Sequence, residues 1–226
     1  MDSASVSPDN KESKERLKAA WDDLIAELQL ARDAIDNPAF FPPEASDRNL
    51  AEGYRYLAGF MHHAVERAFH EDADFPAFRN GLSVYNKSTI DNADAIYFYA
   101  PIDGKKHYRV HGNIADHRHW RGEARAESGP LAPQYLIFEV HSGAMSGDSG
   151  DLRELAAGGR TGFGSLDTSS LSVADNGDFE LLLGPEKPAG YSGNFVCTRK
   201  PPSKRNPDGD DRYADYISGR QLFYDW

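Results

Sequence analysis

One segment of the sequence places a carboxylate and an imidazole two residues apart. Residues 134–141 read Gln-Tyr-Leu-Ile-Phe-Glu-Val-His, an alternating run of the kind that predicts a β-strand. Because successive side chains of a strand point to opposite faces, Glu139 and His141 share one face. The pair suits a general acid and base, or two ligands of a divalent metal, but two groups complete neither kind of site. We take Glu139 and His141 as candidate catalytic residues, with an exposed polar pair as the alternative.

Two further runs with the same alternation hold tyrosine, arginine and histidine. Residues 95–101 form the first run and residues 106–112 the second. If both strands neighbour the first one in a sheet, their polar faces together form a surface that binds a polar ligand by aromatic stacking and hydrogen bonds. The alternative is the solvated outer face of an antiparallel sheet. The candidate ligand-binding residues of these two runs are Tyr97, Tyr99, Arg109 and His111.

Arg220 is a further candidate ligand-binding residue. It lies in the aromatic segment 217–226, where alternation places it on one strand face with Leu222, Tyr224 and Trp226. An arginine aligned with aromatic rings is either a stacked structural residue or an anchor for the carboxylate of a ligand. The stacked structural role is the favoured of the two.

A short histidine motif resembles the first metal-binding motif of the cupins, a class of β-barrel proteins. It consists of Gly112, His117, His119, Glu123 and Gly129. The spacing is one residue short at each end, and three arginines in the same stretch disfavour a cation. A protein metal site needs three or four ligands, and no second motif supplies them. We therefore assign no metal ligand and interpret the segment as a loop. The sequence identifies no cofactor.

Composition limits the partners of the chain. The 226 residues include 25 Lys and Arg against 36 Asp and Glu, a formal net charge of −11. Such a field repels phosphate backbones, so we expect no nucleic-acid partner. The sequence has no signal peptide and no apolar run long enough to span a bilayer, so we expect no membrane partner. The single cysteine, Cys197, permits no internal disulfide. These features favour a cytoplasmic protein.

The first third of the chain predicts a disordered tail and two helices. Residues 1–12 are polar and form the expected tail, and residues 13–75 form the helical region. The second helix begins with Asp47 as its cap. Each helix has an apolar stripe that could pack on a sheet or form the seam of a homo-oligomer. The stripe of the first helix consists of Leu17, Trp21, Leu24, Leu28, Ala31 and Ile35.

From residue 80 to residue 226 the pattern changes to short β-rich runs separated by turns. Asp103-Gly104 and Asn176-Gly177 are hairpin signals. Hairpins in series predict antiparallel pairing. The fold class is therefore α+β, with N-terminal amphipathic helices followed by an antiparallel β-sandwich or jelly-roll-like domain. The expected strands are residues 95–101, 106–112, 134–141, 171–174, 178–183, 194–198 and 217–226.

Four segments of the β region together resemble the bacterial domain of unknown function 1214 family. They are Asp91–Asp103, His107–Gly112, Asn176–Gly184 and Gly219–Trp226. The resemblance covers roughly residues 80–226 and implies a β-rich, sandwich-like fold with a role in processing carbohydrate or another small molecule. It brings no catalytic residues. Similar proteins often continue beyond the last aromatic strand, which suggests that the chain is a fragment of a longer protein.

Three functions are compatible with these patterns. The first is binding or processing of a small polar or amphipathic molecule, with a carbohydrate as one candidate, on a β-sheet face. The second is a metal-assisted hydrolase or lyase that uses Glu139 and histidines. The third is a non-enzymatic interaction or dimerisation domain that uses the helices. The sequence does not decide whether the protein is an enzyme.

Overall fold

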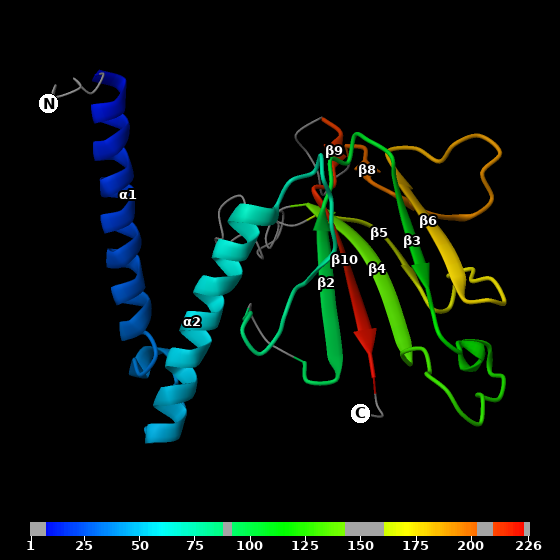
Figure 1. Ribbon diagram of the computed structural model, residues 1–226, viewed down its shortest axis with the longest axis horizontal. Coiled ribbons are helices and arrows are strands. Elements are labelled where there is room, and N and C mark those ends of the chain that lie inside the picture. Colours follow the sequence, from blue (N-terminus) through cyan, green and yellow to red (C-terminus); the bar gives the residue numbers. More distant parts are fainter. Residues whose placement is uncertain (1–7, 88–91, 143–160, 203–209, 224–226) are drawn as a thin grey trace, which may run out of the picture. The chain divides into compact units, whose positions relative to one another are not determined.

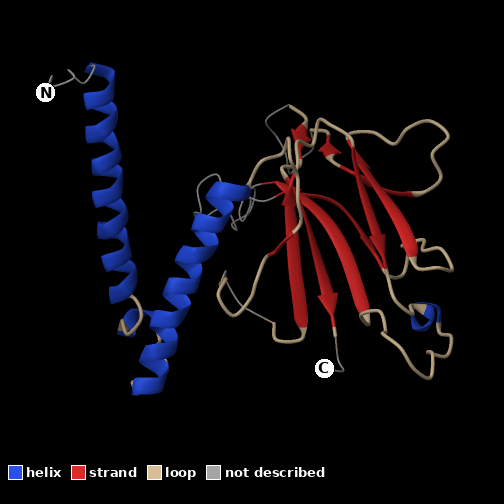
Figure 2. Ribbon diagram, in the orientation of Figure 1, coloured by secondary structure: helices blue, strands red, loops and turns tan. Residues whose placement is uncertain are grey.

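The computed structural model describes residues 8–87, 92–142, 161–202 and 210–223. Two helices are followed by a β-rich region, which confirms the α+β class (Figure 2). The chain forms two compact units, Met1–Met61 and His62–Trp226. Neither helix, over the residues that the structure describes, combines the length and apolar character needed to span a membrane.

The first unit contains helix α1, Pro8–Asp33, and the first part of helix α2. The helix starts five residues before the expected Ser13, so the prediction of a disordered tail is wrong for Pro8–Glu12. Proline is well suited to the first position of a helix, because its fixed φ is helical and the lost N–H has no partner there. A 3-10 turn, Pro38–Phe40, follows, and the Asn37 side chain accepts a hydrogen bond from the Ala39 amide at 3.0 Å.

Helix α2, Asp47–His70, begins one residue after its cap. The Ser46 hydroxyl oxygen accepts a hydrogen bond from the Asn49 amide at 3.2 Å, so Ser46 and not Asp47 is the capping residue. Asp47 instead occupies the first turn, where a negative charge favours the helix dipole. The last turns of α2, from His62 onward, belong to the second unit.

The second unit is built around a five-stranded antiparallel sheet in the order β1-β2-β10-β4-β5. Figure 1 shows β10 between β2 and β4. The last strand of the series therefore lies at the centre of this sheet. The strands are β1 Arg79–Asn80, β2 Ala95–Pro101, β4 Tyr135–Ser142, β5 Thr161–Asp167 and β10 Tyr216–Leu222.

A second sheet has the order β3-β6-β7, and a two-stranded ribbon joins β8 and β9. β6 pairs antiparallel with β3 but parallel with β7, so the pairing is not antiparallel throughout. These strands are β3 Tyr108–Asn113, β6 Asp178–Gly184, β7 Asn194–Cys197, β8 Arg199–Lys200 and β9 Arg212–Tyr213.

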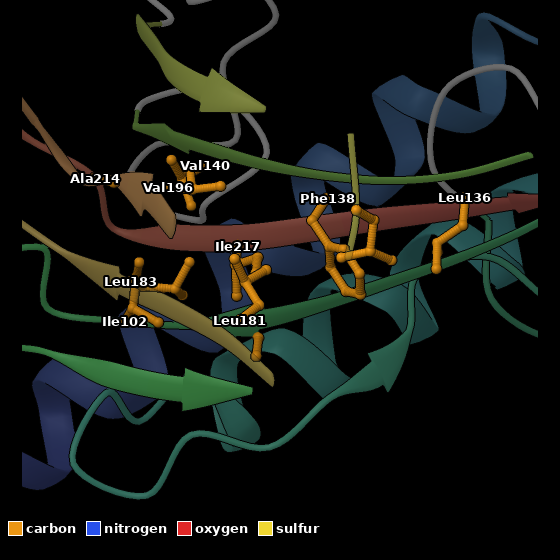
Figure 3. Packing of buried hydrophobic residues seen from close by; sticks show 11 residues of the cluster. Ile102, Leu136, Phe138, Val140, Leu181, Leu183, Val196, Ala214 and Ile217 are labelled. Carbon is orange, nitrogen blue, oxygen red and sulfur yellow. The ribbon is translucent and has the colours of Figure 1, made fainter. Parts of the chain in front are cut away.

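The two larger sheets bury one apolar core between them, as in a β-sandwich. Figure 3 shows side chains from both sheets in this core. Leu181, Leu183 and Ile217 are almost completely buried. The five-stranded sheet contributes Ala100, Leu136, Phe138, Val140 and Ile217, and the second sheet contributes Leu181, Leu183 and Val196.

One hairpin prediction and one strand prediction were wrong, and one strand was missed. Asp103-Gly104 does not close a hairpin, because β2 and β3 lie in different sheets. Residues 171–174 form no strand, although Leu171 is fully buried in the core. The strand β5 was not expected, since its sequence Thr-Gly-Phe-Gly-Ser-Leu-Asp contains two glycines. Residues 224–226 of the last expected strand lie outside the described residues.

Candidate functional site

The outer face of the five-stranded sheet gathers most of the predicted site residues. Tyr99 lies directly opposite Ser218, which lies opposite Glu139. Tyr97 lies opposite Arg220 in the next row. Residues directly opposite in a ladder share a face and are close enough for their side chains to interact. All five alternate with core residues and so point away from the core.

Arg79 extends this arrangement to the edge of the sheet, because it pairs with Tyr99 from β1. His141 extends it along β4, opposite Tyr216. We call this set the outer-face cluster. Its members are Arg79, Tyr97, Tyr99, Glu139, His141, Ser218 and Arg220.

Arg220 is stacked on an aromatic ring. Its guanidinium carbon lies 6.0 Å from the centroid of the Tyr97 ring, at the distance of a cation–π contact. The Nε atom of Arg220 is buried and has no hydrogen-bond partner among the described residues. Arg220 is therefore packed against Tyr97, and one of its donors is both buried and unpaired among the described residues.

Glu139 and His141 lie next to each other, as the alternation predicted. The His141 Nε2 atom is 3.9 Å from a Glu139 carboxylate oxygen. A register shift between Val140 and His141, where β4 pairs with β5, interrupts the ladder at this point. Such irregularities re-aim side chains near functional sites. His141 is 7% exposed and its ring lies 5.4 Å from that of Tyr216, so the imidazole is packed rather than solvated.

The end of helix α2 covers Tyr99. The Arg67 guanidinium carbon lies 4.9 Å from the centroid of the Tyr99 ring, and the His63 ring lies edge-on at 6.3 Å. Arg67 also pairs with Glu71 one turn later. Burial raises the pKa of the Tyr99 hydroxyl, and burial followed by the nearby Arg67 charge lowers the pKa of His63. Both groups are therefore neutral at physiological pH.

A buried asparagine fixes this end of the helix. The Asn86 amide nitrogen donates to the Glu66 carboxylate and to the Asn80 carbonyl oxygen, the latter at 3.4 Å. Asn86 is 4% exposed. Since Asn80 belongs to β1, the same asparagine joins the helix to the edge strand that positions Arg79.

Three buried polar atoms of the outer-face cluster lack a partner among the described residues. They are the Tyr99 hydroxyl oxygen, Arg79 Nε and Arg220 Nε. Leaving a buried polar group unpaired costs about 1–3 kcal/mol, and native proteins keep few such groups. A ligand or an ordered water is the usual explanation for such a group in a native fold.

Ser218 has the smallest side chain of the outer-face cluster. Its small side chain stands between Tyr99 and Glu139 across the sheet, and between Tyr216 and Arg220 along its own strand. Neighbouring strands are about 4.8 Å apart and side chains on one face of a strand are about 7 Å apart. A molecule lying over Ser218 would therefore be within reach of all four larger side chains.

Arg109 and His111 do not join this face. Both lie on β3 in the second sheet, where they face Glu180 of β6. Alternation assigned their polar face correctly, because Tyr108 and Val110 pack against the core. The expectation that this strand neighbours β2 and β4 was wrong.

The histidines of the cupin-like motif make local backbone contacts. His117 Nδ1 lies 3.3 Å from the Ala115 carbonyl oxygen, and His119 Nε2 lies 3.2 Å from the Pro133 carbonyl oxygen. Both rings pack beside Trp120. Over the described ranges, no group of three or more histidine, cysteine, aspartate or glutamate side chains is arranged to hold a metal ion.

Sequence reasoning missed the residues that come from outside the predicted strands. His63, Arg67 and Arg79 are not among the candidate site residues of the sequence. The only sequence signal for His63 and Arg67 is their spacing of four residues, which places both on one helical face. Arg79 offers none, since its strand has only two residues.

Comparisons with known proteins support the fold and give no function. No family model matches the chain, and no curated protein does. The structure is similar to the crystal structure of an uncharacterised protein from Burkholderia cenocepacia, with a TM-score of 0.63 and 25% sequence identity. The match covers 91% of this chain but 45% of that protein, so this chain spans less than half of its length.

Proposed function

We propose that this chain binds a small polar molecule with an anionic group on the outer face of its five-stranded sheet. One observation carries the proposal. Tyr99, Arg79 and Arg220 each keep a buried polar atom without a partner among the described residues. Tyr99 and Arg220 adjoin Ser218, and Arg79 lies beyond Tyr99 on the edge strand. Two of the three are arginines, whose planar guanidinium groups suit a carboxylate.

Each member of the cluster has a chemical role in this proposal. Arg220 and Arg79 bind the anionic group, and Tyr97 contacts the body of the ligand by stacking. Tyr99, whose ring is already covered by Arg67 and His63, contributes its hydroxyl group. Glu139 and His141 lie on β4, on the other side of Ser218 from Tyr99, and accept hydrogen bonds from the ligand or donate them to it. At 3.9 Å from each other, they are also the pair that would move a proton if the ligand is a substrate.

A sugar acid fits these groups best, because it combines hydroxyl groups, a sugar face for stacking and one carboxylate. The direct test is to titrate the protein with glucuronate and, separately, with glucose. Binding is measured by isothermal titration calorimetry or from amide chemical shifts. We expect glucuronate to bind more tightly, since charge-assisted hydrogen bonds are about twice as strong as neutral ones.

Two substitutions locate the site. Ser218→Phe places a ring at the centre of the cluster and should abolish glucuronate binding. Ser192→Phe adds the same ring to an exposed loop position between β6 and β7 and should not. Arg220→Lys keeps the charge but removes the planar fork and should weaken binding about tenfold. Glucuronate binding that survives Ser218→Phe, or no binding of either sugar, would disprove the proposal.

A second candidate is self-association through helix α1. Leu17 and Trp21 are each 64% exposed and Leu24 is 45% exposed. Together with Leu28 and Ala31 they recur at alternating spacings of four and three, which is the heptad spacing of a coiled-coil seam. Ile35, the last residue of the expected stripe, lies beyond the end of α1 at Asp33. We propose a second copy of this chain as the partner, because the same seam is then present on both helices.

A further inference from the structure

A pocket of about 220 Å³ that is open to solvent lies between the two sheets of the sandwich, and its lining is both polar and apolar. It is bordered by β2 and β10 of one sheet, by β3 and β6 of the other, and by the segment that contains Phe78. Ile102, Leu183 and Ile217 of its wall can be followed in Figure 3. The apolar lining residues are Phe78, Ala100, Ile102, Val110, Leu183 and Ile217.

The volume and lining of this cavity suit a small hydrocarbon group. An engineered apolar cavity of roughly 150 Å³ in another protein binds benzene, and drug-sized ligands need about 300 Å³ or more. A volume of 220 Å³ lies between these two limits. A pocket that is open to solvent leaves apolar lining in contact with water, which is unfavourable. A short alkyl chain or a single ring would displace that water.

Two cationic or potentially cationic residues border the pocket from β3, the edge strand of its sheet, with their side chains on the opposite face of that strand from Val110. Arg109 and His111 of β3 both contribute to its border. They share one carboxylate, that of Glu180, at 3.7 Å for Arg109 and 3.8 Å for His111. These distances are too long for hydrogen bonds. The Arg109 side chain is 66% exposed, so most of its five donors are available to an anion in solvent.

We propose that this cavity binds a small amphipathic carboxylate, with its hydrocarbon part between the sheets and its carboxylate at Arg109. The site is separate from the outer-face cluster, because β2 and β10 turn opposite faces to the two. Ala100 and Ile217 face the cavity, whereas Tyr99 and Ser218, the neighbouring residues, face outward. Either site can therefore be present without the other.

The experiment compares hexanoate, 1-hexanol and hexylamine as probes at pH 7.5, with binding measured from amide chemical shifts. We expect hexanoate to bind most tightly and hexylamine most weakly. Val110→Phe places a ring in the cavity and should weaken hexanoate and hexanol by about tenfold or more. Ala100→Val, on the opposite wall, narrows the same space and should act in the same direction, so the result does not depend on one variant that folds poorly.

The carboxylate contact has its own test. Arg109→Gln should weaken hexanoate about threefold to fivefold, as expected for an exposed ion pair, and leave hexanol unchanged. Arg199→Gln removes a matched arginine from β8, which does not border the cavity, and should change neither. Hexanoate binding that is insensitive to both filling variants, or absent, overturns the cavity. Equal binding of hexanoate and hexanol, unchanged in Arg109→Gln, overturns the carboxylate contact.

Discussion

Tyr99 is the residue through which the helix and the sheet of the second unit meet. Arg67 and His63 of α2 pack on its ring, and Arg79 pairs with it across the ladder. Its hydroxyl has no partner among the described residues, although the residue is 8% exposed. The Tyr99 ring is thus well packed, whereas its hydroxyl group has no hydrogen-bond partner among the described residues. A substitution that removes only the hydroxyl group can therefore distinguish the contributions of the two.

Tyr99→Phe should separate stability from binding. Removing an unsatisfied buried hydroxyl is expected to leave the free energy of unfolding unchanged or raise it by up to about 1 kcal/mol. The same change should weaken glucuronate binding, because the proposed ligand loses one hydrogen bond. Urea unfolding and calorimetric titration of the same variant measure both effects. A loss of stability with unchanged binding would mean that the hydroxyl has a structural partner.

His63 predicts a pH dependence of stability. Its pKa is lowered in the folded chain by burial, whereas in the unfolded chain it takes up a proton near pH 6.5. Below that value the unfolded state binds more protons, so the free energy of unfolding falls as the pH falls. His63→Gln should flatten this decline between about pH 7 and pH 5, as measured by urea unfolding. His62→Gln changes the exposed neighbouring histidine and serves as the control; an equal slope in both variants would contradict the assignment.

For single residues, the sequence predicted which face of a strand a side chain occupies, but not which strands lie next to one another. Alternation predicted that Tyr97 and Tyr99 lie on the other face of β2 from Phe98. It also predicted that Glu139 and His141 lie on the other face of β4 from the core residues of that strand. The structure agrees with both predictions. It could not show that Arg109 belongs to the other sheet, because alternation describes one strand at a time. The helix residues that cover Tyr99 depend on contacts that no local pattern encodes.

The central strand β10 depends on a glycine that admits an aromatic ring. Gly219 lies opposite Phe98, and a Cβ atom at Gly219 would lie 2.1 Å from Cζ of the Phe98 ring. The ring also packs edge-on with Phe78 and Phe138 at 5.3 and 5.7 Å. No side chain can replace this hydrogen atom without displacing Phe98.

Gly219→Ala should destabilise the second unit by about 1–3 kcal/mol through overpacking. Ser218→Ala is the matched substitution on the opposite face of the same strand and should stay within about 0.5 kcal/mol. Thermal or urea unfolding of the two variants gives the comparison. Equal stabilities would show that the Phe98 ring can move aside without cost.

The elements themselves were predicted unevenly, for physical reasons. Strong alternation identified β2, β4 and β6 nearly to the residue. β5 was missed because glycine is disfavoured in strands, and it forms here through tertiary pairing with β4. The turn Asn176-Gly177 is present, with Gly177 at a φ of 86°, but the residues before it do not continue into a strand.

At the scale of the whole molecule, the apolar stripe of α1 predicts association. Replacing Trp21 and Leu24 by glutamate puts charge into the seam and should convert a dimer into a monomer, as measured by sedimentation velocity over a range of protein concentrations. Replacing Asp22 and Asp23, which lie on the side of the helix away from the stripe, by asparagine is the control and should leave the dimer intact. A wild-type chain that is monomeric at every concentration would refute the seam.

The position of β10 has a consequence for how this protein is made. β2 and β4 both pair with β10, which follows β4 by more than seventy residues in the chain. During translation, β2 and β4 therefore leave the ribosome with open edges and stay so until Leu222 has emerged. Open strand edges invite pairing with other chains, and long-range pairing is slow. The nascent chain should thus depend on chaperones, and a ribosome that stalls before β10 should release an aggregation-prone product.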